Sequence, residues 1–84
     1  KRTIVGIQIT ERTKGAVKLQ ETLTKFGCTI KTRLGLHEAT TQMCSTSGLI
    51  ILELLDESPD RDILIDELKG LPGIQVQTME FESK

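Results

Sequence analysis

Aromatic side chains are almost absent from this chain of 84 residues, which has no tryptophan or tyrosine and only two phenylalanines. Domains that recognise single-stranded RNA stack the bases on aromatic side chains of their central strands, so the composition argues against that class. Eleven basic residues nearly balance twelve acidic ones, and the net charge is −1. Such a chain has no broad basic surface with which to neutralise phosphates. We therefore expect no direct contact with nucleic acid and no association with a membrane surface.

Long apolar runs and paired cysteines are missing as well. The longest apolar run spans Leu49 to Leu55 and is broken by Glu53, whereas a membrane-spanning helix needs about 20 apolar residues. Only two cysteines are present, and they form no CxxC pair. This spacing argues against a disulfide framework and against zinc-ribbon chemistry. Together these absences favour a cytoplasmic protein.

The residues that are present alternate between strand and helix patterns. Alternating and β-branched residues predict strands at 3–10, 28–36 and 74–81, and the apolar run 48–55 predicts a strand that is apolar on both faces. Apolar residues at three- and four-residue spacing predict a helix that ends at Gly27, with Thr10 or Thr13 as its N-cap. A second helix is expected to begin near Ser58 and to end at Gly70.

The order β-α-β-β-α-β predicts one domain, residues 1–84, of the α+β class. Its expected fold is ferredoxin-like, a four-stranded antiparallel sheet with two helices on one face. The uncovered face should be polar in a monomer, but whichever side of the third strand faces the helices, the other side is apolar. The residues expected on the uncovered face are Ile4, Leu49, Ile51, Leu55, Met79 and Phe81, with Ile50, Leu52 and Leu54 as the alternative set in the third strand.

An apolar face of this kind usually marks an interaction surface, and we expect a second copy of the chain to cover it. The alternative is that the chain termini or the connector between the second and third strands cover it. Cys28, at the start of the second predicted strand, is expected to be a small core residue.

From Arg33 to Phe81 the chain resembles the small iron-only hydrogenase system regulators, which are ACT-like, ferredoxin-like proteins. The resemblance rests on RLGL (33–36), on the apolar strand that starts at Gly48, on the acidic turn and helix after it, and on LPG (71–73) before the last strand. These motifs are turn glycines and core positions, which specify a fold more than a chemistry. The resemblance implies a regulatory domain that assembles into dimers or tetramers.

In ACT-like domains the loop after the first strand commonly binds a small ligand, often an amino acid, next to a neighbouring subunit. The matching loop here is TERTKG, whose amides, glycine and basic side chains suit an anion. The candidate ligand-binding residues are Thr10, Arg12, Thr13, Lys14 and Gly15, with Arg33 as a second anion contact. The alternatives are an ordinary capped helix start and, for Arg33, the solvated side of an edge strand.

The connector 34–48 holds the only histidine of the chain, His37, together with Cys44. A planar nitrogen-and-sulfur metal site needs about four ligands, so this pair would complete one only where two copies meet at a two-fold axis. A connector between strands also accepts both residues without any special purpose. We expect no cofactor.

Catalysis finds little support, because the acidic residues at 56–62 lie in a turn and at a helix start, where the helix dipole accounts for them. The sequence therefore predicts a non-enzymatic ACT-like regulatory domain that self-associates through its sheet and senses a small anion or amino acid, or binds a protein partner. The resemblance implies regulation of transcription or of a hydrogenase system. The alternative function is a metal-binding sensor that uses His37 and Cys44 at a subunit interface.

Overall fold

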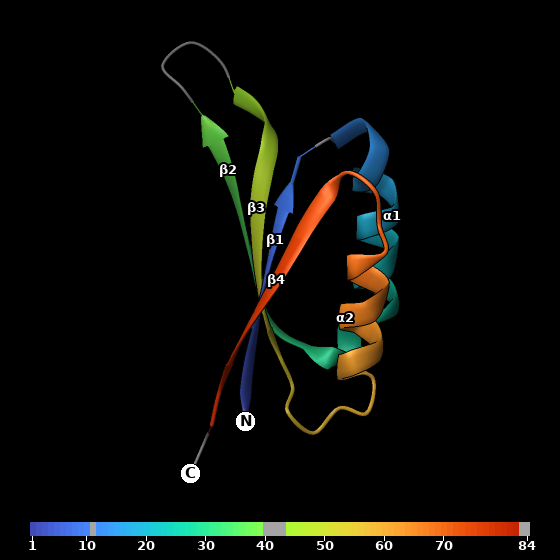
Figure 1. Ribbon diagram of the computed structural model, residues 1–84, viewed down its shortest axis with the longest axis vertical. Helices are drawn as coiled ribbons and strands as arrows, with labels where there is room; N and C mark the ends of the chain where they lie inside the picture. Colours follow the sequence, from blue (N-terminus) through green and yellow to red (C-terminus); the bar gives the residue numbers. More distant parts are fainter. Residues whose placement is uncertain (11, 40–43, 83–84) are drawn as a thin grey trace.

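The described part of the chain folds as a four-stranded sheet with two α-helices (Figure 1). The computed structural model describes residues 1–10, 12–39 and 44–82, and side chains within 1–10, 15–35 and 48–82. The elements in chain order are β1 (Arg2–Ile9), α1 (Arg12–Lys25), a short 3-10 helix η1 (Gly27–Thr29), β2 (Ile30–Ala39), β3 (Cys44–Leu54), α2 (Arg61–Lys69) and β4 (Ile74–Phe81).

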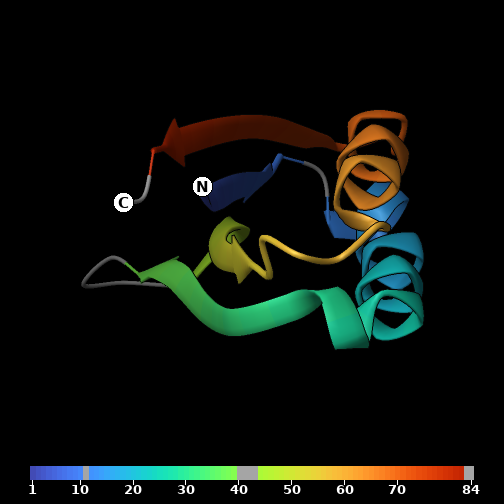
Figure 2. The same cartoon turned by 90° about the horizontal axis from the view of Figure 1, so that it is seen from below.

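The strands lie in the order β2-β3-β1-β4, and each neighbouring pair is antiparallel. The central strands β1 and β3 pair Val5 with Leu52 and Ile7 with Ile50. Both helices pack on the same side of the sheet (Figure 2). This arrangement is the predicted α+β, ferredoxin-like fold. Within the described part of the chain, no helix is long and apolar enough to cross a bilayer.

The core lies between the sheet and the helices, and residues at the predicted spacings fill it. Every second residue of the two central strands points into it, as does one stripe of each helix. Each buried aliphatic side chain contributes about 1.5–3 kcal/mol relative to an exposed one. The buried apolar residues are Val5, Ile7, Ile9, Leu19, Leu23, Phe26, Ile50, Leu52, Leu54, Leu64, Ile65 and Leu68.

Strand β2 begins with an irregularity that the sequence pattern did not reveal. Ile30 pairs with Leu54, yet Thr32 pairs with Glu53, so β2 advances two residues while β3 advances one. Lys31 is therefore the extra residue of a β-bulge. A one-residue shift of this kind moves every later side chain of the strand to the other face of the sheet.

The bulge overturns the predicted facing of β2. Leu34, which strict alternation from Ile30 would place under the helices, pairs with Ile51 on the uncovered face, and 52% of its surface is exposed. Arg33, expected on the solvated face, lies on the helix side, where its Nη2 donates a hydrogen bond to Gln20 Oε1 at 2.9 Å. The uncovered face is therefore more apolar than the sequence indicated.

Cys28 is also placed differently from the prediction. It lies in η1, between Gly27 and Thr29, and its side chain is exposed. The amide of Thr29 donates a hydrogen bond to the Phe26 carbonyl at 2.9 Å, which extends the end of α1 by a tight turn. The strand therefore begins two residues later than expected, and Cys28 never enters the core.

Helix α2 begins at Arg61, three residues after its predicted start. Ser58 does not cap the helix; its Oγ accepts a hydrogen bond from the Asp60 amide at 3.2 Å and shares another with Thr29 Oγ1 at 2.9 Å. Ser58 therefore stabilises the turn before the helix rather than the helix itself.

Candidate functional site

We call the side of the sheet away from the helices the open face. On it lie even-numbered residues of β1 and odd-numbered residues of β3 and β4, because paired residues of antiparallel strands share a face. Its most exposed apolar side chains are Leu34 (52%), Met79 (56%) and Phe81 (50%). Among the described side chains, the apolar ones on the open face are Ile4, Leu34, Leu49, Ile51, Met79 and Phe81.

Five of the six residues predicted for an interface thus lie on the open face, and Leu34 is one that the sequence missed. The sixth, Leu55, lies beyond the end of β3, where its amide donates a hydrogen bond to the Thr29 carbonyl at 2.8 Å. Only the register between β2 and β3 could have revealed Leu34, because its position depends on the bulge at Lys31.

The open face divides into four corners by chemistry. The register aligns Leu34, Ile51, Gly6 and Gln77 in one row across the sheet. Apolar residues thus occupy two diagonally opposite corners, and polar residues occupy the other two. The corners are an apolar β2–β3 corner (Leu34, Leu49, Ile51), an apolar β1–β4 corner (Ile4, Met79, Phe81), a glutamine corner (Gln8, Gln75, Gln77) and a charged corner (Lys31, Glu53), into which the side chain of Arg2 reaches from β1 beside Phe81.

A shallow depression of about 180 Å³ lies on the open face beside Gly6. Its walls are Gln8, Leu49, Gln75 and Gln77. Since Gly6 has no side chain, this is where another molecule can approach the backbone of the central strand most closely.

Ion pairs to Glu53 join the three charged side chains at the charged corner. Arg2 Nε donates a hydrogen bond to Glu53 Oε2 at 2.7 Å, and Lys31 Nζ lies 3.9 Å from the same oxygen. The hydrogen bond from Arg2 is the main reason that the pKa of Glu53 lies below its ordinary value. Two cations share one carboxylate, so the three side chains together carry a net charge of about +1.

The two described ends of the predicted ligand loop, Thr10 and Gly15, contact the turn between α2 and β4. The Thr10 amide donates a hydrogen bond to the Gly73 carbonyl at 2.9 Å. Gly15 is buried, and a Cβ atom placed there would lie 2.5 Å from the carbonyl oxygen of Pro72. Gly15 thus allows α1 to pack closely against Pro72 in the turn before β4. The side chains of Arg12, Thr13 and Lys14 lie outside the described residues.

The structure does not bring Arg33 to that loop. Arg33 contacts Gln20 in α1, which is about 12 Å along the helix from its first residue, at 1.5 Å per residue. The described contacts of Arg33 therefore lie about two helical turns from the start of α1.

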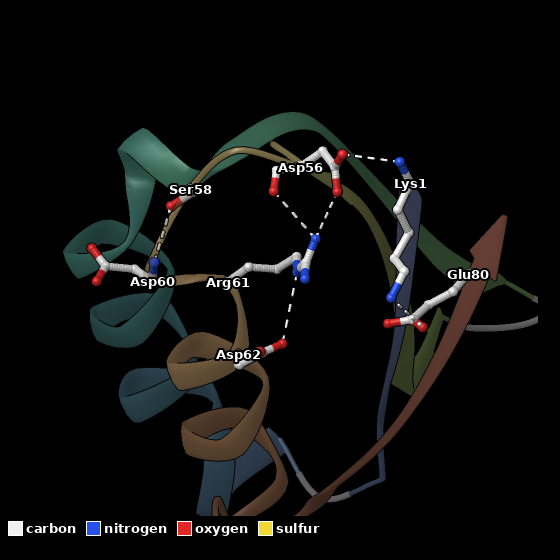
Figure 3. Close-up of polar contacts among 7 residues, drawn as sticks. All are labelled: Lys1, Asp56, Ser58, Asp60, Arg61, Asp62 and Glu80. Atoms are coloured by element: carbon white, nitrogen blue, oxygen red, sulfur yellow. Dashed lines mark hydrogen bonds and ion pairs between the residues drawn. The ribbon is translucent and has the colours of Figure 1, made fainter. Parts of the chain in front are cut away.

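The acidic residues after β3 form a polar cluster with a structural role (Figure 3). Arg61 donates hydrogen bonds to the carboxylate and the carbonyl of Asp56, at 2.8 and 3.3 Å. The α-ammonium group of Lys1 donates to the same carboxylate at 2.9 Å, and the side-chain Nζ of Lys1 lies 3.5 Å from Glu80. These bonds, first that from the Lys1 ammonium and then that from Arg61, lower the pKa of Asp56. The cluster ties the β3–α2 turn to the sheet.

Neither half of the predicted metal pair has a described side chain. The backbone register pairs His37 with Gly48 and Cys44 with Ala39, so the two residues lie near the same end of the β2–β3 hairpin. Among the described residues, no three histidine, cysteine or acidic side chains come together as a metal site.

Comparisons with known proteins bear on the fold. No family model matches the chain, and no curated protein matches it. Among solved structures it is similar to the uncharacterized protein TM1266 from Thermotoga maritima, with 23% identity, a TM-score of 0.75 and 94% of each chain covered. It is also similar to a formyltetrahydrofolate deformylase from Pseudomonas putida, with 15% identity and a TM-score of 0.51 over 95% of this chain.

The chain spans 29% of the deformylase, so that likeness concerns one part of a larger protein. Both likenesses support the ferredoxin-like, ACT-like fold. The ACT-like part of the resemblance seen in the sequence is thereby confirmed, and the hydrogenase-system regulator family stays a prediction.

Proposed function

We propose that this chain is a non-enzymatic, ACT-like regulatory domain that works by association of its copies through the open face. The observation that supports the proposal is the apolar character of that face, with Leu34, Met79 and Phe81 each about half exposed. A small domain gains stability when such a surface is covered, because the apolar area leaves water. A ligand or protein partner that binds the assembled form better than the single chain would shift the equilibrium, and this shift is the regulatory event.

The size of the open face suits a stable complex. Four strands at about 4.8 Å spacing and eight residues at about 3.3 Å give a footprint of about 500 Å². A standard interface buries about 800 Å² of accessible surface on each partner, and accessible surface exceeds the flat footprint. The finer role, regulation of transcription or of a hydrogenase system, follows from the resemblance in the sequence and belongs to the same proposal.

Association through the open face is tested by substituting Leu34 with glutamine. The side chain is half exposed in the single chain, so the fold should tolerate the change. Burial of the exposed half in a complex is worth about 1 kcal/mol for each copy, and a symmetric pair buries two copies. We expect the dissociation constant measured by sedimentation equilibrium to rise by about tenfold or more.

The matched control is Val17→Gln. Val17 is 73% exposed on α1, on the other side of the molecule, and this substitution should leave association unchanged. A wild-type chain that sediments as a monomer at all concentrations contradicts the proposal, and so do equal effects of the two substitutions.

The regulatory part is tested by a thermal-shift screen with amino acids and small carboxylates. A ligand that binds the folded chain at a hundredfold excess over its Kd adds about 2.7 kcal/mol of stability. We expect a ligand that raises the unfolding temperature to change the sedimentation behaviour as well. A ligand that stabilises the chain without changing its association would contradict regulation through assembly.

A further inference from the structure

The pattern on the open face limits how a second copy can lie across it. The two apolar corners occupy one diagonal, and the glutamine and charged corners occupy the other. In a closed dimer one two-fold axis relates the two copies, and for sheets packed face to face this axis lies in the plane between them. The direction of the axis in that plane decides which corner of one copy lies over which corner of the other. Each possible direction of the axis can therefore be judged by the chemistry of the corners that it places face to face.

Axes along or across the strands give poor contacts. If the axis runs parallel to the strands, the β2–β3 apolar corner of one copy covers the glutamine corner of the other. If it runs across the strands, the same corner covers the charged corner. Both arrangements leave polar groups facing apolar surface, where they lose their hydrogen bonds to water.

Axes along the diagonals place apolar surface on apolar surface. An axis along the polar diagonal also places each charged corner on its own copy, which brings the two copies of Lys31 together. An axis along the apolar diagonal avoids this, because it places the glutamine corner over the charged corner. Glutamine amides donate and accept hydrogen bonds, so they suit both the cations and Glu53.

Gly6 supplies an independent reason to expect close contact at this face. Glycine in the middle of a central strand weakens it and often marks a place where another backbone approaches. A Cβ atom at Gly6 would meet only the Gln77 carbonyl oxygen, at 3.9 Å, so the single chain does not require glycine there. The position lies near the centre of the open face, where a diagonal two-fold axis would cross.

We propose that two copies pack open face to open face with their strands crossing near 90°, about a two-fold axis along the apolar diagonal. Orthogonal packing is one of the two common arrangements of facing sheets. This inference rests on the proposed function, and it adds the geometry of the pair. Each apolar corner then contacts the same corner of the other copy, and each glutamine corner contacts the charged corner.

Cross-linking at the two ends of β4 tests the direction of the axis. Phe81 and Gln75 are exposed residues of the same edge strand, one in an apolar corner and the other in the glutamine corner. Each is changed to cysteine in the full chain after Cys28→Ser and Cys44→Ser remove the native thiols. Facing sheets lie about 10 Å apart, which is too far for a direct disulfide, so a short bismaleimide is used.

We expect Phe81→Cys to cross-link efficiently with itself and Gln75→Cys to give at least tenfold less dimer. The reverse result would place the axis on the polar diagonal, and failure of both would favour aligned strands; each overturns the inference. Sedimentation of the wild type under the same conditions shows whether the copies associate at all. A wild type that associates while neither variant cross-links therefore contradicts this geometry and leaves the proposed function standing.

Discussion

At the scale of single residues, glycines and charged pairs decide how neighbouring segments meet. Gly73 has a φ of 74°, a left-handed conformation that favours glycine, and it follows Pro72 in the turn before β4. The carbonyl of Gly73 accepts a hydrogen bond from the Thr10 amide, and the carbonyl of Pro72 packs against Gly15. The LPG motif therefore positions the loop that the resemblance assigned to a ligand.

The first residue-scale prediction concerns Gly15→Ala. In an ordinary helix this change is favourable by about 1 kcal/mol, but here the new methyl group would lie 2.5 Å from the Pro72 carbonyl oxygen. Overpacking of this kind destabilises proteins by about 1–3 kcal/mol. After the helix gain is subtracted, we expect the free energy of unfolding, measured with urea, to fall by up to about 2 kcal/mol.

Gly35→Ala is the control for Gly15→Ala, because no atom lies within 4 Å of a Cβ built there. Its effect should stay within about 0.5 kcal/mol. Equal effects of the two substitutions would show that α1 and the Pro72 turn are not packed as described.

The second residue-scale prediction concerns the pH dependence of the Arg2–Glu53 pair. The hydrogen bond from Arg2 lowers the pKa of Glu53 in the folded chain. Between the folded and the unfolded pKa of Glu53, the unfolded chain therefore binds more protons than the folded chain. The stabilisation is therefore present above the unfolded pKa of about 4.3 and is lost as pH falls through the folded value. Arg2→Gln should reduce stability at pH 7 and make little difference at pH 2.

Urea unfolding of wild type and variant across that pH range provides the measurement. The comparison is made as a difference, because the pKa of Asp56 is lowered too and affects both proteins alike. Lys18→Gln, which removes an exposed positive charge from α1, serves as the control. A difference between Arg2→Gln and wild type that persists at pH 2 would mean that Arg2 acts through packing rather than through Glu53.

At the scale of elements, each helix presents one buried and one exposed apolar surface. Leu64, Ile65 and Leu68 of α2 are buried against the sheet, whereas Ile63 is half exposed. An ion pair between Lys25 and Glu67, at 3.1 Å, joins the two helices at the surface. Since exposed pairs of this kind contribute about 0–1 kcal/mol, burial of the leucine stripe holds the helices on the sheet.

The prediction for this scale compares Leu68→Ala with Ile63→Ala. Leu68 is fully buried, and leucine-to-alanine changes in a core destabilise by about 2–5 kcal/mol. Ile63→Ala should change the free energy of unfolding by less than about 1 kcal/mol, since half of its side chain already contacts water. Denaturation with urea measures both. A large loss at Ile63 would indicate that the outer surface of α2 is covered in solution.

At the scale of the whole molecule, the sheet has two different faces. One face carries the helices, and the other carries two apolar corners around a central glycine. The proposed association explains why the second face is apolar, because a second copy covers its apolar corners. The Leu34 substitution tests the association, and the Phe81 and Gln75 cross-links test its geometry.

Local patterns in the sequence were sufficient to predict the order of elements and most of the open face. Alternation with period two placed Ile4, Met79 and Phe81 correctly, and β4 runs from 74 to 81 as predicted. These features depend on neighbours in the chain, so a single sequence expresses them directly.

Contacts between distant residues decided the rest. The bulge at Lys31 moved Leu34 to the open face, and the pairing register placed the apolar corners on one diagonal. The contact between Gly15 and Pro72 likewise joins residues far apart in the chain. The alternation pattern of one strand does not specify which residues of a neighbouring strand will pair with it. Only the folded sheet could therefore show how the residues of its surface are arranged.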